Sequence, residues 1–320
     1  MSARAPFPRA HRQAVGVGAG QGMAMIGPGP LGVIAGPCVV ESEALVLSVA
    51  ERLVELCAVR GLPFVFKSSY KKANRSSKHS FTGPGDRAGL AALAAVKRTF
   101  GVPIVTDVHA VSEVGPAAEV ADLLQIPAFL SRQTELLVAC AASGRPVNVK
   151  KGQFLAPDDM RLVVDKLESA GAQGILLTER GVTFGYHNLV VDMRSLVLMA
   201  ECGWPVVYDV THSLQLPGAG DGVSGGDRRF ARPLARAAVA VGVDAVFFET
   251  HPDPARALSD AATQLPLADV PALLDELVAV RAARDGGPAP NAAAAAGARR
   301  EVPTVAPATM PGTTPGGMSP

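Results

Sequence analysis

Eight short apolar segments, each followed by a longer segment with helical spacing, constrain the fold of this chain most strongly. Strands are expected over 31–36, 64–69, 103–108, 123–128, 147–152, 174–179, 206–212 and 245–251. Apolar residues recur every three or four positions in the segments between and after them, which predicts helices over 44–60, 86–100, 112–121, 132–143, 158–170, 188–202, 230–241 and 269–284. Strands that alternate with helices pair in parallel, and closing the sheet removes its exposed edges. The sequence therefore predicts an α/β fold, the (β/α)₈ TIM barrel; an open doubly wound sheet is the alternative.

The length of the chain fits one such barrel. Its 320 residues exceed the about 250 residues that a barrel of this kind needs. We expect a loose N-terminal extension over 1–30, a folded body over 31–284, and a disordered tail over 285–320. Ala, Gly or Pro occupy 22 of the 36 tail positions, so the tail cannot bury enough apolar surface to offset the entropy of ordering it.

Charge and cysteine content argue against several classes of protein. The net charge is +1, so no overall field attracts nucleic acid or a membrane surface. No apolar run reaches the about 18 residues of a membrane span. The four cysteines form no CxxC pair, which favours a reduced, cytoplasmic protein over a disulfide-rich one.

Charged or metal-binding side chains stand at the ends of most predicted strands. The C-terminal ends of barrel strands line one rim, and that rim holds the active site. Residues far apart in the sequence should therefore meet there. The strand-end residues are Cys38, Lys67, Asp107, Lys150 with Lys151, Glu179 with Arg180, Asp209 with His212, and Glu249 with His251.

The cations of this rim indicate two anion sites. Phosphate or carboxylate groups are natural partners for so many cations. The first set could hold a small trianion such as phosphoenolpyruvate, and it comprises Lys67, Lys72, Lys150 and Arg180. The second set lies in the loop just beyond and comprises Asn74, Arg75 and Ser76. Alternatively, the cations form ion pairs with Asp107, Glu179 and Glu249.

Four further side chains indicate a metal site. Predicted strands one and eight become neighbours when the barrel closes, and strand seven adjoins strand eight. The candidate ligands are Cys38, His212, Glu249 and, in the loop after strand eight, Asp260. One sulfur, one imidazole and two carboxylates suit Zn²⁺, Fe²⁺, Mn²⁺ or Co²⁺. The residues alone leave open that His212 contacts substrate instead and that Cys38 is a buried thiol.

Several motifs, in order along the body, closely resemble one family. They are IAGPCVVES (34–42), KANRSS (72–77), TDVH (106–109), SRQTEL (131–136), NVKKGQF (148–154), TERG (178–181), YDVTHSLQLPG (208–218) and ETHPDPARALSDAATQLPL (249–267). The chain resembles 3-deoxy-D-manno-octulosonate 8-phosphate synthases. The resemblance implies a homotetrameric (β/α)₈ barrel that joins phosphoenolpyruvate to D-arabinose 5-phosphate and releases phosphate, for lipopolysaccharide synthesis.

The same resemblance implies roles for individual residues. Cys38 is typical of the metal-dependent members of the family, and their ligands correspond to Cys38, His212, Glu249 and Asp260. Phosphoenolpyruvate is expected at Lys67, Lys72, Lys150 and Arg180. The sugar phosphate is expected at Asn74, Arg75 and Ser76, with Arg132 contributed by a neighbouring subunit.

We expect catalysis to depend on Asp107, His212 and Lys150, with the first two relaying protons or ordering water. The glycine-rich segment 217–226 is a candidate lid over the mouth of the barrel. Two other functions remain as alternatives. One is a related synthase that uses erythrose 4-phosphate, although that family carries a KPRTSP-like segment where this chain has KANRSS. The other is a barrel that binds sugar phosphates without turnover.

Overall fold

The computed structural model describes residues 12–73, 80–218 and 225–286. Eight parallel strands, buried along their whole length, form the centre of the fold. Their sequences are rich in branched aliphatic side chains, as expected for strands covered on both faces. The eight are β3 (Gly32–Gly36), β4 (Phe64–Lys67), β5 (Ile104–Asp107), β6 (Leu123–Ile126), β7 (Val147–Lys150), β8 (Ile175–Glu179), β11 (Val206–Asp209) and β14 (Ala245–His251).

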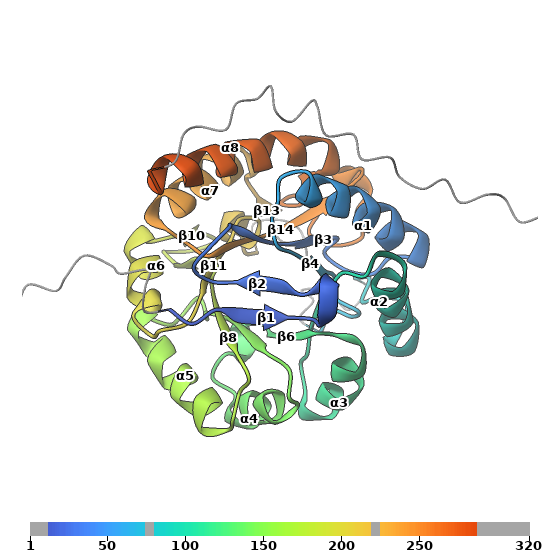
Figure 1. Cartoon of the computed structure of the whole chain (residues 1–320), viewed down its shortest axis with the longest axis horizontal. Helices are drawn as coiled ribbons and strands as arrows, with labels where there is room; N and C mark the ends of the chain where they lie inside the picture. The colour runs from blue at the N-terminus through green and yellow to red at the C-terminus, as the bar shows by residue number, and fades with distance from the viewer. Residues whose placement is uncertain (1–11, 74–79, 219–224, 287–320) are drawn as a thin grey trace, which may run out of the picture. The chain divides into compact units, whose positions relative to one another are not determined.

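A helix follows each of these strands, and the helices ring the strands (Figure 1). Their starts and ends reflect local chemistry. Ser42 caps the first helix by accepting a hydrogen bond from the Leu45 N–H, and Gly101 ends the second in the left-handed conformation. The helices are α1 (Glu43–Ala58), α2 (Asp86–Phe100), α3 (Val111–Val120), α4 (Thr134–Ala142), α5 (Met160–Ser169), α6 (Met193–Ala200), α7 (Ala231–Val241) and α8 (Val270–Arg284).

The sheet closes on itself. Each strand pairs in parallel with its neighbour in chain order from β3 to β8, β8 pairs with β11, and β11 pairs with β14. Strand β14 then pairs with β3 over Ala245–Gly32 to Glu249–Gly36. The predicted (β/α)₈ TIM barrel is confirmed, and the open sheet is excluded because the first and last strands are hydrogen-bonded.

The prediction of a loose extension over 1–30 is wrong for residues 15–26. Strands β1 (Val15–Val17) and β2 (Ala24–Ile26) form an antiparallel hairpin across one end of the barrel (Figure 1). Val15 and Ile26 are buried, and an added Cβ on Gly174 or Gly32, where β8 and β3 start, would meet their side chains. The hairpin therefore closes the N-terminal end of the barrel.

The predicted helix over 188–202 is also partly wrong. Residues Leu189–Val190 form strand β10, which pairs with β9 (Val182–Thr183), and the helix begins at Met193. Asp192 sets this start because its side chain accepts a hydrogen bond from the Arg194 N–H. The predicted tail falls outside the described residues except for Asp285 and Gly286.

Candidate active site

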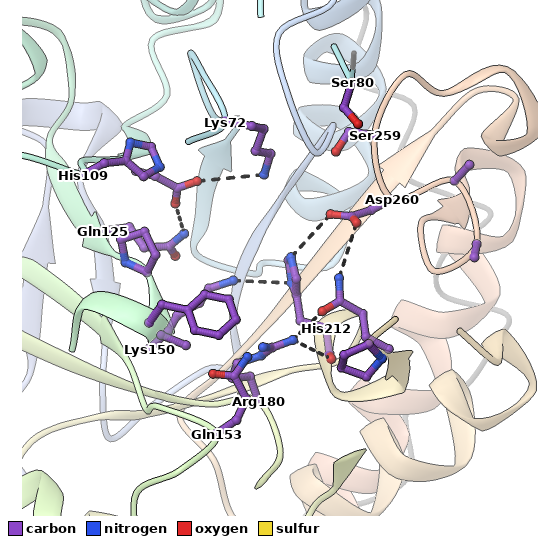
Figure 2. Close-up of a pocket in the computed structure, with 18 of the residues that line it drawn as sticks. Lys72, Ser80, His109, Gln125, Lys150, Gln153, Arg180, His212, Ser259 and Asp260 are labelled. Carbon is purple, nitrogen blue, oxygen red and sulfur yellow. Dashed lines mark hydrogen bonds and ion pairs between the residues drawn. The ribbon is translucent and has the colours of Figure 1, made fainter. Parts of the chain in front are cut away.

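A cavity of about 460 Å³ opens at the C-terminal ends of the strands, opposite the hairpin. Figure 2 shows that side chains from several strands and from the loops after them point into it. The charged residues that line it are far apart in the sequence, and the first and last of them are separated by 188 positions. The fold therefore brings them together. These are Lys72, Asp107, His109, Lys150, Arg180, His212 and Asp260.

Two buried cations, Lys150 and Arg180, and the partly buried Lys72 face this cavity. Lys150 Nζ lies 2.7 Å from Asp209 Oδ2 and 3.8 Å from the centre of the Phe247 ring. Arg180 donates through Nη2 to the His212 carbonyl at 2.9 Å, while among the described residues its Nε has no hydrogen-bond partner. Lys72 Nζ stands 3.9–4.0 Å from the Glu249 and Asp107 carboxylates. An anion in the cavity would meet donors on three sides.

Burial and neighbouring charges shift the protonation equilibria of this cavity. Burial lowers the pKa of Lys150 and of Arg180, because the charged forms lose hydration. Burial alone would raise the pKa of Asp107, but Lys67 and Lys72 outweigh it and hold that pKa well below its usual range. Asp107 is therefore a carboxylate at neutral pH. An anion that enters the cavity could accept hydrogen bonds from Arg180 Nε and Lys72 Nζ, which have no close acceptor among the described residues.

A chain of buried hydrogen bonds fixes the Asp107 carboxylate. Thr178 donates to Asn148 at 2.6 Å, Asn148 donates to Gln125 at 2.9 Å, and Gln125 donates to Asp107 Oδ1. Ser69 donates to the other carboxylate oxygen. These side chains come from neighbouring strands inside the barrel, and no sequence motif predicts their pairing.

The candidate metal ligands meet beside the cavity. Ligand atoms of Cys38, Glu249 and Asp260 all lie within 4.8 Å of one another. His212 Nε2 lies 3.6 Å from Glu249 Oε1 and 4.0 Å from Asp260 Oδ2. Strands one and eight of the prediction are β3 and β14, which pair as expected. Glu249 lies on β14, and Cys38 follows the end of β3 by two residues.

The chemistry of this group fits a divalent cation. Glu249 Oε2 is buried and has no hydrogen-bond partner among the described residues, so one carboxylate oxygen is left for a ligand. Burial raises the pKa of the Cys38 thiol well above its usual value, and the Asp260 and Glu249 carboxylates raise it further. A thiolate at neutral pH therefore needs a cation beside it. Asp260 has a φ of +46°, a conformation that surrounding structure must hold in place.

Asp209 is a site residue to which sequence reasoning gave no role. Its carboxylate accepts hydrogen bonds from Lys150 Nζ at 2.7 Å and from His212 Nδ1 at 3.0 Å. With Nδ1 engaged, the Nε2 atom of His212 faces the other three candidate ligands. The position of Asp209 at the end of β11 was visible in the sequence, but its two partners were not.

Other predicted residues lie elsewhere. The described lining of the cavity does not include Lys67, which is fully buried and donates to Glu249 Oε1 at 2.8 Å and to the Cys38 carbonyl at 3.2 Å. The ion-pair alternative thus holds for Lys67 with Glu249 and, at 3.9–4.0 Å, for Lys72 with Glu249 and Asp107. Lys150 pairs instead with Asp209. Arg132 is exposed and stands outside this described lining. Asn74, Arg75 and Ser76, and positions 219–224 of the candidate lid, lie outside the described residues.

Fold and site together define a (β/α)₈-barrel enzyme whose mouth joins a cationic cavity to a cluster of metal-binding side chains. Comparison with known proteins narrows the class. The model of the DAHP synthetase I family matches residues 14–283. Among the described residues, no helix is long and apolar enough to cross a bilayer.

Curated relatives are similar over most of the chain. One from Trichlorobacter lovleyi is 56% identical over 78% of this chain and 92% of the relative, and it is named 2-dehydro-3-deoxyphosphooctonate aldolase. Proteins of the same name from Syntrophobacter fumaroxidans and Geobacter sulfurreducens are 56% and 55% identical, over 79% and 80% of this chain and 88% and 94% of the relatives. The chain belongs to the DAHP synthetase I family, with the 2-dehydro-3-deoxyphosphooctonate aldolases. The resemblance seen in the sequence and the expectation of a carbon–carbon bond-forming enzyme are confirmed.

Proposed function

We propose that this enzyme condenses phosphoenolpyruvate with D-arabinose 5-phosphate and water, giving 3-deoxy-D-manno-octulosonate 8-phosphate and phosphate. The observation that carries the proposal is the convergence of three cations on one cavity beside four candidate metal ligands. The names of the relatives support the same substrates. A binding protein without turnover would not need the cluster of Cys38, Glu249 and Asp260.

Phosphoenolpyruvate is proposed to bind against Lys72, Lys150 and Arg180. Its carboxylate and phosphate supply the anionic partners that buried cations require. Lys67 does not line the cavity, so it is assigned no direct contact with phosphoenolpyruvate. Its ammonium instead donates a hydrogen bond to the Glu249 carboxylate. The sugar phosphate is assigned to Asn74, Arg75 and Ser76, and to Arg132 of a second copy of the chain, which the family resemblance supports.

The condensation needs negative charge to be stabilised on the aldehyde oxygen and water to be directed at C2 of the enol. Lys150 can supply a proton or a fixed positive charge at that oxygen, since burial lowers its pKa. Asp107, held as a carboxylate, can accept a hydrogen bond from the attacking water and so orient it. His212, oriented by Asp209, can hold water or substrate near the same point.

A divalent metal is proposed at Cys38, His212, Glu249 and Asp260. Bound there, Zn²⁺, Fe²⁺, Mn²⁺ or Co²⁺ would supply Lewis acidity, either for orienting the aldehyde or for activating water. The unpartnered Glu249 oxygen and the buried Cys38 thiol support this assignment. A buried carboxylate oxygen without a hydrogen-bond partner is costly unless a ligand engages it.

We further propose a homotetramer in the cytoplasm. Large aromatic side chains are exposed after three neighbouring strands at the active-site rim: Phe129 after β6, Phe154 after β7, and Phe184 and Tyr186 after β8. Such exposure favours contact with another copy of the chain. Cys38, Cys57, Cys140 and Cys202 are all free thiols, which fits a reducing compartment. Sedimentation should give four times the mass of one chain, and a monomer would contradict the assembly.

Phosphate release tests the reaction. Purified enzyme with Mn²⁺ should release phosphate when phosphoenolpyruvate and D-arabinose 5-phosphate are both present, and none from either alone. Erythrose 4-phosphate serves as the control aldehyde, because the family description includes DAHP synthetases. A preference for erythrose 4-phosphate, or hydrolysis of phosphoenolpyruvate alone, would contradict the proposed substrates.

A further inference from the structure

The Glu113 carboxylate, in the first turn of α3, gathers four hydrogen-bond donors. Oε2 accepts from the His109 N–H at 2.8 Å, from His109 Nδ1 at 3.2 Å and from the Tyr70 hydroxyl at 2.8 Å. Oε1 lies 2.8 Å from Lys71 Nζ. The described lining of the cavity does not include Glu113 itself. A carboxylate in the first turn of a helix is also stabilised by the helix dipole.

One of these partners lines the cavity, and another is the chain neighbour of a residue that lines it. His109 lines the cavity directly, on the side of Lys72 and Gln125 (Figure 2). Lys71 precedes Lys72 in the chain, so an anchored Lys71 restricts the backbone from which Lys72 reaches toward Asp107 and Glu249. One carboxylate thus joins the loop after β4 to the loop after β5.

The contact with Nδ1 fixes the tautomer of His109. A carboxylate accepts hydrogen bonds and donates none, so Nδ1 must carry a proton whenever it contacts Glu113. In the neutral ring, Nε2 is then a bare acceptor. Among the described residues Nε2 of His109 has no hydrogen-bond partner, which leaves it for a bound water or substrate.

We infer that Glu113 is a positioning residue of this active site, which sets the tautomer of His109 and the place of the Lys72 ammonium. The predicted change in turnover rests on the proposed function. The predicted change in the tautomer of His109 does not. Glu113→Gln is the sharpest perturbation because it keeps the shape of the side chain. Its amide has one acceptor oxygen, so an NH₂ group must face either Lys71 or the Tyr70–His109 side.

Two measurements test the inference. Nitrogen NMR of ¹⁵N-histidine-labelled enzyme without substrates measures the tautomer of His109. The His109 signals are identified as those that disappear in the His109→Gln variant. Wild-type enzyme should show Nδ1–H, and Glu113→Gln should shift the population toward Nε2–H. Steady-state assays should show a higher KM for phosphoenolpyruvate through Lys72 and a lower kcat through His109. The loss in kcat/KM should be about 10- to 100-fold, as for other partners that orient an imidazole.

Two controls make the result decisive. Glu119→Gln removes the same charge from an exposed position of α3 and should leave both measurements at wild-type values. Glu113→Asp keeps the carboxylate and should keep the Nδ1–H tautomer with a smaller loss of kcat/KM. Wild-type values in Glu113→Gln, equal losses in Glu119→Gln, or an Nε2–H tautomer in Glu113→Asp would each overturn the inference. Absence of phosphate release by wild-type enzyme would contradict the proposed function instead.

Discussion

Replacing Asp209 by Asn should destabilise the protein and slow turnover, because Asp209 is the shared acceptor of Lys150 and His212. Both contacts are short, at 2.7 and 3.0 Å, and the Asp209 side chain is fully buried. Breaking a buried ion pair costs about 3–5 kcal/mol, and Asn retains one acceptor oxygen, so we expect the lower end. A cost of about 3 kcal/mol lowers Tm by roughly 5 °C in a folded body of this size, because the entropy of unfolding is about 2.1 cal/mol/K per residue.

Thermal unfolding followed by circular dichroism measures the loss, with Asp165→Asn as the matched control. Asp165 is exposed on α5, and its replacement should change stability by less than about 0.5 kcal/mol. A double-mutant cycle with Lys150→Met separates the pair from its surroundings, because two residues in direct contact should couple by at least about 0.5 kcal/mol. A Tm within about 2 °C of wild type, or strictly additive losses, would refute the role of Asp209.

Three further predictions concern the metal, the second substrate and acid stability. Chelation should abolish activity, which Mn²⁺, Co²⁺ or Fe²⁺ should restore, and Cys38→Ala should not retain metal; full turnover by stripped enzyme would refute the metal site. Arg75→Ala should raise the KM for the sugar phosphate far more than the KM for phosphoenolpyruvate, and equal effects would refute two separate anion sites. Lys67 and Lys72 hold the pKa of Asp107 below its usual range, so protons bind the unfolded state first and stability should fall as pH drops below about 4. Denaturant unfolding of Asp107→Asn should show a shallower acid slope, and an unchanged slope would contradict this origin.

The barrel was predictable because its strands are short apolar runs bounded by turn residues. The run at 147–152 became Val147–Lys150, and the run at 245–251 kept both ends. The β1–β2 hairpin is not predictable from the sequence, because each strand has three residues in a glycine-rich stretch, too few for a clear alternation. The helix predicted over 188–202 is longer than α6 because Leu189 and Val190 fit helical spacing, although they pair as a strand.

The site was predictable as a set of residue types at strand ends, and less so as a set of contacts. Strand order alone brings Cys38 next to Glu249, so their meeting followed from the barrel. The length and direction of a side chain decide the rest. Lys67 turns to Glu249 instead of the cavity, and Asp209 reaches two partners at once. Glu113 acts on the cavity from a helix, where strand-end reasoning does not look.

Anomalous X-ray scattering from crystals grown with Mn²⁺ and phosphoenolpyruvate tests most directly whether metal and substrate share one mouth. We predict one ion bound by Cys38, His212, Glu249 and Asp260, with phosphoenolpyruvate in the adjoining cavity against Lys150 and Arg180. An ion bound elsewhere, or phosphoenolpyruvate outside that cavity, would contradict it.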